Sequence, residues 1–324
     1  MNEVLITGAN GYIGARLSKF LSENGYAVTA LCFPSAPKDE KWSKSLNRVI
    51  VGDIRNESVI EEIASCNIDT VIHLISLDHN QCSKFSFNDV LSVNVSPTAN
   101  LLEKLSKKSL KKFIYFSTFQ VYGSVEHTLI TEDYKTLPLN VYGLTHLLSE
   151  KICNYYNSTS EIDCISVRLS NSYGSPVFSD NNCWWLVINE LCKDAFLYDK
   201  VQLKSDGSPL RDFIHSSDLC AAIKILIDKD EKSMDNTYNL SSGETLSILE
   251  LAFKVREIYI ARYKKNIDVV LPDGKVRDYS SNYSPGNRFT IDNTKIRKFG
   301  FNPSFNIEDG INDLFNYLEI NYGR

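Results

Sequence analysis

Short apolar runs alternate with helix-like segments along the first half of the chain. The apolar runs are rich in Val and Ile and show no alternation with polar residues, which predicts strands covered on both faces. Strands are expected at Glu3–Thr7, Ala27–Cys32, Arg48–Val51, Asp69–Leu74, Lys112–Ser117 and Cys164–Leu169. Helices are expected at Ile13–Glu23, Glu57–Ala64, Val90–Ser106 and Val141–Tyr155. Strands that alternate with helices predict βαβ units, and therefore an α/β fold with a doubly wound parallel sheet.

The pattern becomes less regular in the second half of the chain. Helices are expected at Asn182–Lys193, Ser217–Ile227 and Ser247–Tyr259, and a last helix carries Ile307, Ile311, Leu314, Phe315 and Leu318 on one stripe. The polar stretch from Pro272 to Arg288 is typical of a long loop. This half looks too irregular to fold alone. It is therefore expected to cover the carboxyl edge of the sheet, where ligands of open α/β sheets bind.

Composition and charge narrow the function classes. The net charge is -5 and there is no basic block, so nucleic-acid binding is not expected. None of the eight cysteines forms a CxxC pair or a zinc-site spacing, which predicts buried free thiols in a reducing compartment and no metal. No run of about 18 apolar residues and no signal-like segment occurs, so we expect a cytoplasmic protein without membrane contact.

A glycine-rich turn follows the first strand and opens the first helix, with Gly8, Gly11 and Gly14 at intervals of three. Glycines at such a turn let a pyrophosphate approach the bare backbone, and the helix N-terminus supplies amide donors. The order strand, turn, helix predicts a Rossmann-type NAD(P)-binding domain over residues 1–170. A smaller α/β cap for the substrate is expected over residues 171–324, and part of it is expected to return to the sheet.

The GxxGxxG spacing, the segment Gly52-Asp53-Ile54 and the strand Val71–Leu74 together resemble the extended short-chain dehydrogenase/reductases of the NAD-dependent nucleotide-sugar epimerase/dehydratase type. The resemblance extends along essentially the whole chain. It implies that the cofactor is bound by Gly8, Asn10, Gly11, Tyr12, Ile13, Gly14, Asp53, Ile54, Leu74, Ile75, Asn94, Tyr142 and His146. His73, in the fourth strand, is expected to be a packed histidine without a catalytic role.

One cofactor residue of this family is missing. An acid that binds the ribose 2′-hydroxyl is expected at the end of the second strand, but the chain has Cys32-Phe33-Pro34 there. No arginine replaces it, although Lys38 and Lys41 are near in sequence. NAD is the expected cofactor, and NADP is not excluded.

The resemblance also implies the catalytic residues. Thr118 matches the family's Ser/Thr position, which orients the substrate hydroxyl, and Tyr142 matches the proton-exchanging tyrosine. The family's lysine four residues after the tyrosine is His146 here. A neutral imidazole can still bind the nicotinamide ribose but lowers the tyrosine pKa less than a cation does, whereas a protonated imidazole could do both. The other interpretation is a decayed site.

The residues after Thr118 argue against one reaction of this family. Members that dehydrate the sugar resemble one another in an Asp-Glu pair there, whereas this chain has Phe119 and Gln120. A 4,6-dehydratase is therefore not expected. The segments Arg168–Gly174 and Asp206–Phe213 also resemble this family. The resemblance implies that the substrate contacts Thr118, Gln120, Asn171, Arg211 and Arg288, the two arginines as phosphate ligands. Trp184 and Trp185 are expected to lie in the core.

The function that these residues favour is NAD(P)-dependent oxidoreduction of a nucleoside diphosphate sugar, most simply C4 epimerisation through a keto sugar. Two alternatives stay open, an NADPH-dependent 4-ketosugar reductase and a non-catalytic dinucleotide sensor or scaffold. The resemblance further implies a homodimer that pairs the helices Val90–Ser106 and Val141–Tyr155.

Overall fold

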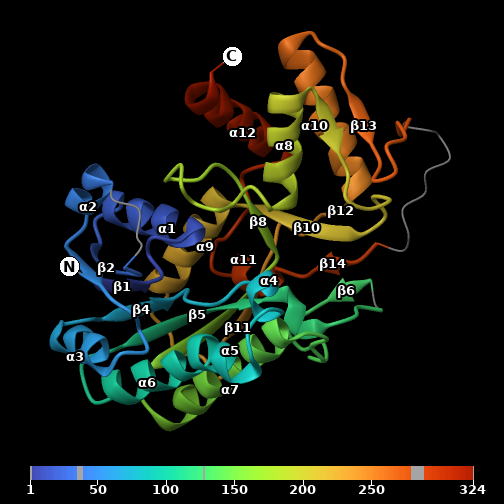
Figure 1. The fold of residues 1–324 in the computed structure, drawn as a ribbon. Helices are drawn as coiled ribbons and strands as arrows, with labels where there is room; N and C mark the ends of the chain where they lie inside the picture. Colours follow the sequence, from blue (N-terminus) through green and yellow to red (C-terminus); the bar gives the residue numbers. More distant parts are fainter. Residues whose placement is uncertain (1, 35–38, 127, 279–287, 324) are drawn as a thin grey trace.

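A seven-stranded parallel sheet forms the centre of the larger part of the molecule, as Figure 1 shows. The computed structural model describes residues 2–34, 39–126, 128–278 and 288–323. The strand order is β11-β7-β5-β4-β1-β2-β3. These strands are β1 (Glu3–Thr7), β2 (Ala27–Cys32), β3 (Arg48–Val51), β4 (Thr70–His73), β5 (Lys112–Thr118), β7 (Asp163–Leu169) and β11 (Thr237–Leu240). The predicted α/β class with a parallel, doubly wound sheet is confirmed.

Helices cover both faces of this sheet, which explains the continuous apolar runs of its strands. In β1, Val4 and Ile6 pack into one core, while Leu5 packs into another on the opposite face. The first core is shared by α1 (Tyr12–Glu23), α2 (Glu40–Ser45), α9 (Ser216–Asp228) and α11 (Thr294–Arg297). The second is shared by α3 (Glu57–Ser65), α6 (Ser96–Leu105) and α7 (Val141–Thr159).

A buried lysine fixes α9 against the sheet. The Nζ of Lys112, at the start of β5, donates to the carbonyl oxygens of Leu226, Ile227 and Lys229 at 2.8, 2.6 and 2.6 Å. These carbonyls lie at the carboxyl end of α9, where backbone acceptors have no partner within the helix. Burial lowers the pKa of this ammonium group, and the carboxylate of Asp163 opposes that shift.

Two predicted helices were wrong in their bounds. The segment Val90–Ser106 is not one helix but two, α5 (Phe87–Asn94) and α6, which are separated at Val95. Pro97 stands in the first turn of α6, where the missing N–H of a proline costs nothing. The helix predicted at Asn182–Lys193 begins only at Val187 and is α8 (Val187–Tyr198).

A smaller lobe lies over the carboxyl edge of the sheet (Figure 1). Its centre is a three-stranded sheet of β8 (Asn171–Tyr173), β10 (Leu210–His215) and β12 (Thr245–Ser247). It packs with α8, α10 (Ile248–Tyr263) and α12 (Ile307–Tyr322) around a separate apolar core. The short strands β9 (Lys200–Gln202) and β13 (Asp268–Val270) pair with each other, and β14 (Thr290–Ile291) pairs with β6 (Leu129–Ile130). A short helix, α4 (His79–Cys82), lies between β4 and α5 in the chain.

β11, which the sequence pattern did not predict, comes from the second half of the chain and pairs with β7 in the large sheet. The division of the chain at residue 170 stays a prediction. Part of the predicted loop Pro272 to Arg288, residues 279–287, lies outside the described residues. All eight cysteines are free thiols, and Cys66 alone among them is not buried. In the described part of the chain, no helix is both long and apolar enough to cross a membrane.

Candidate active site

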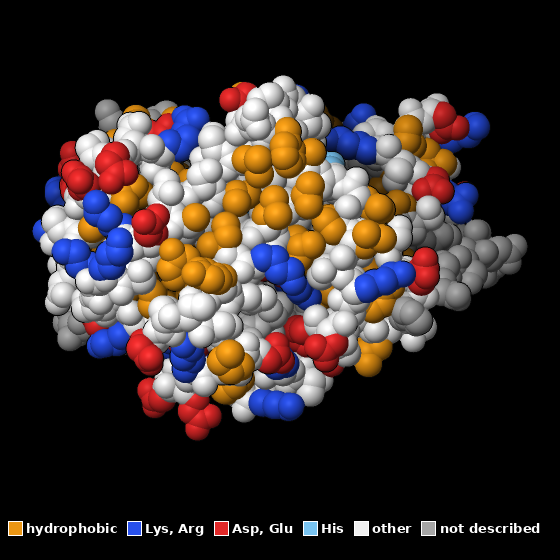
Figure 2. All heavy atoms as spheres, turned by 90° about the horizontal axis from the view of Figure 1, so that it is seen from below, with side chains coloured by type: hydrophobic (Ala, Val, Ile, Leu, Met, Phe, Trp, Pro, Cys, Tyr) orange, Lys and Arg blue, Asp and Glu red, His pale blue; other side chains and the backbone are white. Residues whose placement is uncertain are grey.

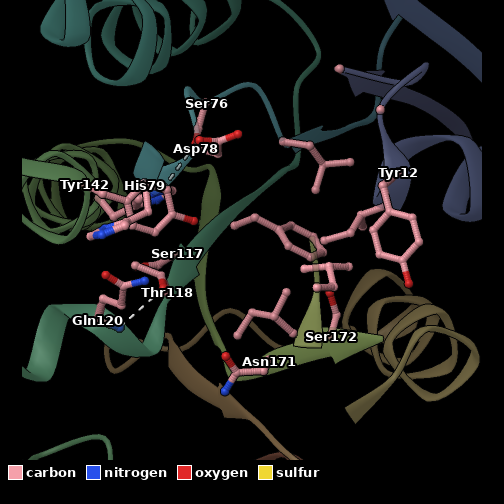
Figure 3. Close-up of a pocket in the computed structure, with 18 of the residues that line it drawn as sticks. Tyr12, Ser76, Asp78, His79, Ser117, Thr118, Gln120, Tyr142, Asn171 and Ser172 are labelled. Atoms are coloured by element: carbon pink, nitrogen blue, oxygen red, sulfur yellow. Dashed lines mark hydrogen bonds between the residues drawn. The ribbon is translucent and has the colours of Figure 1, made fainter. Parts of the chain in front are cut away.

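A cavity of about 370 Å³ opens at the carboxyl edge of the large sheet, below the smaller lobe (Figure 3). It brings together residues that are far apart in the sequence. Of the residues predicted for the site, those on its walls are Gly8, Gly11, Tyr12, Ile13, Gly14, Leu74, Thr118, Gln120, Tyr142, His146 and Asn171. The glycine turn and the candidate catalytic residues therefore share one cavity.

The glycine turn has the geometry of a phosphate cradle. Gly8 has a φ of +70°, which a residue with a side chain rarely adopts. A Cβ on Gly14 would lie 2.2 Å from the carbonyl oxygen of Gly8, so no side chain fits there. No side chain caps the N-terminus of α1, so its first amide groups are open to the cavity. Free amides at a helix N-terminus bind pyrophosphate, and this turn fits a dinucleotide.

Thr118 and Tyr142 lie close together because the carboxyl end of β5 packs beside the first turn of α7. Asn140 caps α7, since its Oδ1 accepts from the backbone N–H of Gly143 at 2.8 Å. Tyr142 thus stands in the first turn of α7, beside Thr118 (Figure 3). Burial raises the pKa of Tyr142 to about 12, and a hydrogen bond with Thr118 opposes that rise. Gln120 is held by Asn140, whose Nδ2 donates to its Oε1 at 2.9 Å.

His146 lies one turn after Tyr142, and the two rings are 4.4 Å apart between centroids. Its Nδ1 is 2.8 Å from the Tyr115 hydroxyl, and its Nε2 is 3.4 Å from the Ser76 hydroxyl. Ser76 gives its own proton to the carbonyl of Leu77, so its oxygen can accept a hydrogen bond from Nε2 of the ring. Burial lowers the pKa of His146 to about 4. At neutral pH the group that replaces the family's lysine is therefore uncharged.

A buried ion pair behind the cavity fixes α7 to the sheet. Glu150, two turns after Tyr142, pairs with Arg168 of β7 through two hydrogen bonds of 3.0 and 2.8 Å. The same carboxylate accepts from the hydroxyl of Ser117, the residue before Thr118. Carboxylate and guanidinium are both nearly inaccessible to water, and a bidentate pair of this kind holds a fixed geometry. The ion pair therefore sets the position of Tyr142 relative to Thr118.

Several residues predicted to bind the cofactor lie outside the cavity. Asp53 pairs with Arg55, and this hydrogen bond is the main reason that the pKa of Asp53 is lowered. Asn94 is buried, where its Oδ1 accepts from Leu77 and its Nδ2 donates to Thr145. Other predicted residues outside the cavity walls are Asn10, Ile54 and Ile75. The roles of all these residues stay predictions.

The two predicted phosphate ligands are also not among the described residues that line the cavity. Arg211 is exposed, and its Nη1 donates to the carbonyl of Leu210 at 2.8 Å. Arg288 forms an ion pair with Glu250, a residue of the capping box at the start of α10. A phosphate at Arg288 would have to compete with this carboxylate. His73, by contrast, is packed as expected, with its Nδ1 2.7 Å from the Thr7 hydroxyl.

The sequence pattern missed part of the cavity wall. Asp78 and His79, directly after the loop that follows β4, line the cavity beside Tyr142 (Figure 3). Trp185 was expected in the core, but it precedes α8, is 42% exposed and lines the cavity. The other cavity residues that were not singled out are Ser76, Phe116, Ser117, Leu169, Ser170, Ser172, Asn182 and Leu186.

Comparison with known proteins agrees with this geometry. The sequence model of the NAD dependent epimerase/dehydratase family matches residues 4–241. The chain belongs to this family. The predicted family and the predicted class of NAD-dependent enzyme are thereby confirmed.

Relatives and solved structures cover nearly the whole chain. The low-salt glycan biosynthesis protein Agl12 of Haloferax volcanii is 26% identical over 97% of this chain and 98% of its own length. The UDP-glucose 4-epimerase of Halalkalibacterium halodurans is 27% identical over 79% of this chain and 80% of its own. The fold matches the UDP-glucose 4-epimerase of Thermotoga maritima with a TM-score of 0.83, at 22% identity over 99% of both chains.

Proposed function

We propose that this protein oxidises and re-reduces one carbon of a nucleoside diphosphate sugar with NAD, and that the reaction is epimerisation at C4. The observation that carries the proposal is the shared cavity, in which the glycine turn of α1 faces Thr118 and Tyr142. The glycine turn would hold the pyrophosphate of a dinucleotide, and it lines the same cavity as the catalytic pair. Relatives named as UDP-glucose 4-epimerases support the choice of reaction.

Each candidate residue has a distinct task in this proposal. Thr118 holds the reacting hydroxyl, and Tyr142 takes its proton and later returns it. His146 would hold the ribose next to the nicotinamide. A nicotinamide dinucleotide held by the glycine turn would supply a reversible hydride acceptor for the sugar carbon. The ion pair of Glu150 and Arg168 holds α7 on β7, and the hydroxyl of Ser117 joins the same carboxylate to β5.

The surroundings of Thr118 favour epimerisation over 4,6-dehydration, although relatives named as dTDP-glucose 4,6-dehydratases also match the chain. Phe119 stacks on Phe289 with centroids 5.6 Å apart and planes at 5°. Gln120 is an amide. Neither side chain can donate and accept a proton in an elimination. A non-catalytic sensor is the second candidate, because the residue in place of the lysine is uncharged and the pKa of Tyr142 is about 12.

The first experiment identifies any nucleotide that the purified protein carries. The protein is denatured and the released nucleotide is separated by chromatography. Roughly stoichiometric NAD or NADH is expected, because an epimerase keeps its cofactor through the cycle. UDP-, GDP-, CDP- and dTDP-glucose are then offered without added cofactor, and the C4 epimer is measured.

The control variant is Tyr142→Phe, which should keep the dinucleotide and lose turnover by at least about a hundredfold. If the purified protein carries no nucleotide, binds NADPH and reduces a 4-ketosugar, the function is that of the reductase and not of the epimerase. Full dinucleotide content with no turnover of any sugar would favour the sensor. A protein that binds neither dinucleotide would refute the proposal.

We also propose a homodimer that is formed through α5 and α7. Figure 2 shows apolar side chains gathered on the face of the molecule that carries α3, α5, α6 and α7 in Figure 1. Phe87, Leu144, Leu148 and Tyr155 of α5 and α7 are 46%, 36%, 37% and 64% exposed. Contiguous exposed apolar side chains are typical of association surfaces. Leu148→Glu should give monomers in sedimentation equilibrium, whereas Ile320→Glu on α12 should not.

A further inference from the structure

The charge of the cavity wall bears on which sugar it accepts. Of the residues that line the cavity, Asp78 carries a negative charge, and none is a lysine or an arginine. His146 is neutral, and the two arginines expected near the substrate are not lining residues; Arg288 is paired with Glu250. Along its described walls, the cavity thus presents one carboxylate and no permanent cation.

Asp78 stands close to the reacting centre. It precedes His79, whose ring meets the ring of Tyr142 edge-on at 6.4 Å between centroids. In Figure 3, Asp78 and His79 lie on one side of Tyr142, and Thr118 and Gln120 lie on the other. The raised pKa of Tyr142 comes mainly from burial, and the charge of Asp78 adds to it. A sugar whose C4 hydroxyl reaches Tyr142 therefore has its neighbouring substituents within the field of Asp78.

The position of this carboxylate is fixed by the backbone. The Oδ1 of Asp78 accepts from the N–H of Gln81 at 2.8 Å, and the Gln81 side chain accepts from the N–H of Asp78 at 3.0 Å. This capping box at the start of α4 prevents the side chain from turning away from the cavity. An incoming negative charge cannot displace Asp78 without breaking the cap.

From this arrangement we infer that Asp78 determines sugar specificity, and that the enzyme accepts a nucleoside diphosphate hexose but rejects the corresponding hexuronic acid. A C6 carboxylate next to Asp78 would place two like charges in a cavity whose described walls offer no lysine or arginine to either. A C6 hydroxyl would instead find an acceptor. The inference rests on the proposed function, because it concerns the substrate of the same site.

The test compares UDP-glucose with UDP-glucuronic acid at about pH 8.5, where imidazole groups carry little charge. For each sugar, kcat/KM for the C4 epimer and the Kd are measured on the full-length, NAD-loaded protein. The key variant is Asp78→Asn, because Asn is an equally good N-cap and the change removes only the charge. The matched control is Asp230→Asn, which removes the same charge from an exposed position after α9, outside the cavity.

The wild-type protein should prefer UDP-glucose by at least about tenfold in kcat/KM, given the Coulomb energy of like charges several ångströms apart after screening. Asp78→Asn should reduce this ratio about tenfold, mainly through tighter binding of UDP-glucuronic acid, and Asp230→Asn should leave the ratio as it is. Equal kcat/KM for the two sugars in the wild type, or a ratio that Asp78→Asn does not change, would overturn the role of Asp78 and leave the proposed function standing. Absence of binding and turnover for both sugars would overturn the proposed function for this nucleotide, and the inference with it.

Discussion

Replacing His146 by lysine should make the enzyme faster at neutral pH. In the wild type the imidazole is uncharged, so no side-chain cation stabilises the phenolate of Tyr142, whose pKa is about 12. The two rings are 4.4 Å apart, so a lysine ammonium in the same place would lie about 5 Å from the phenolate. At an effective dielectric constant of about 20, this distance corresponds to about 3 kcal/mol, or about 2 pKa units.

The expected result is a shift of the pH profile. If the ionised tyrosine is the base, kcat rises with pH up to the pKa of Tyr142, and His146→Lys should move this rising limb down by about 1 to 2 pH units. At pH 8 the gain is about tenfold to a hundredfold. The assay follows kcat for C4 epimerisation from about pH 6 to 10, with the NAD content measured in each preparation. The control, His146→Gln, is polar and neutral and should leave the limb in place. A lysine variant with normal NAD content and an unmoved limb would refute this account of Tyr142.

Three further predictions concern stability and cofactor binding. Burial lowers the pKa of His73 to about 3 and that of His146 to about 4, so the folded protein excludes protons that the unfolded chain binds below about pH 6.5. Between pH 8 and pH 5 the free energy of unfolding should fall by about 2 kcal/mol for each histidine. Burial raises the pKa of Asp212 to about 6, so this carboxyl offsets about 1 kcal/mol of the fall. Urea titrations at both pH values measure the net change, and an equal free energy of unfolding at the two pH values would contradict the prediction. Lys112→Met leaves three carbonyls at the end of α9 without their donor and should lower the free energy of unfolding by about 2–4 kcal/mol, whereas a change below about 1 kcal/mol would mean that water replaces the ammonium. Gly14→Ala should abolish NAD retention, because the added Cβ would overlap the backbone of the glycine turn. Calorimetric titration with NAD measures this, and binding as tight as in the wild type would contradict the prediction.

The sequence predicted most of the large sheet because its strands are buried on both faces. Such strands are continuous apolar runs, and the segments between them are long enough for crossover helices. β11 escaped prediction because Thr237–Leu240 is short and polar in two of its positions, and what makes it a strand is its pairing with β7. The break between α5 and α6 had a local signal in Pro97, whereas the late start of α8 had none that periodicity could reveal.

The candidate site was predictable where a motif marks it. The glycine turn, Thr118 and Tyr142 follow fixed spacings, and the structure gathers them around one cavity. Asp78 and His79 belong to no motif. Their one signal is their place a few residues after the carboxyl end of β4, where α/β sheets bind ligands. The uncharged state of His146 depends on its burial against Tyr115, which no local pattern reports.

The pairing of β11 with β7 has a consequence for how the protein is made. Ser166 of β7 pairs with Thr237 of β11, so the ribosome must add about 70 residues after β7 before its outer edge is covered. At about 5–20 residues per second, an open strand edge persists for about 4–14 seconds. Exposed edges of this kind pair readily with other chains. Slow translation between these strands therefore favours aggregation of the nascent chain, and expression of the first 170 residues alone would make that exposure permanent.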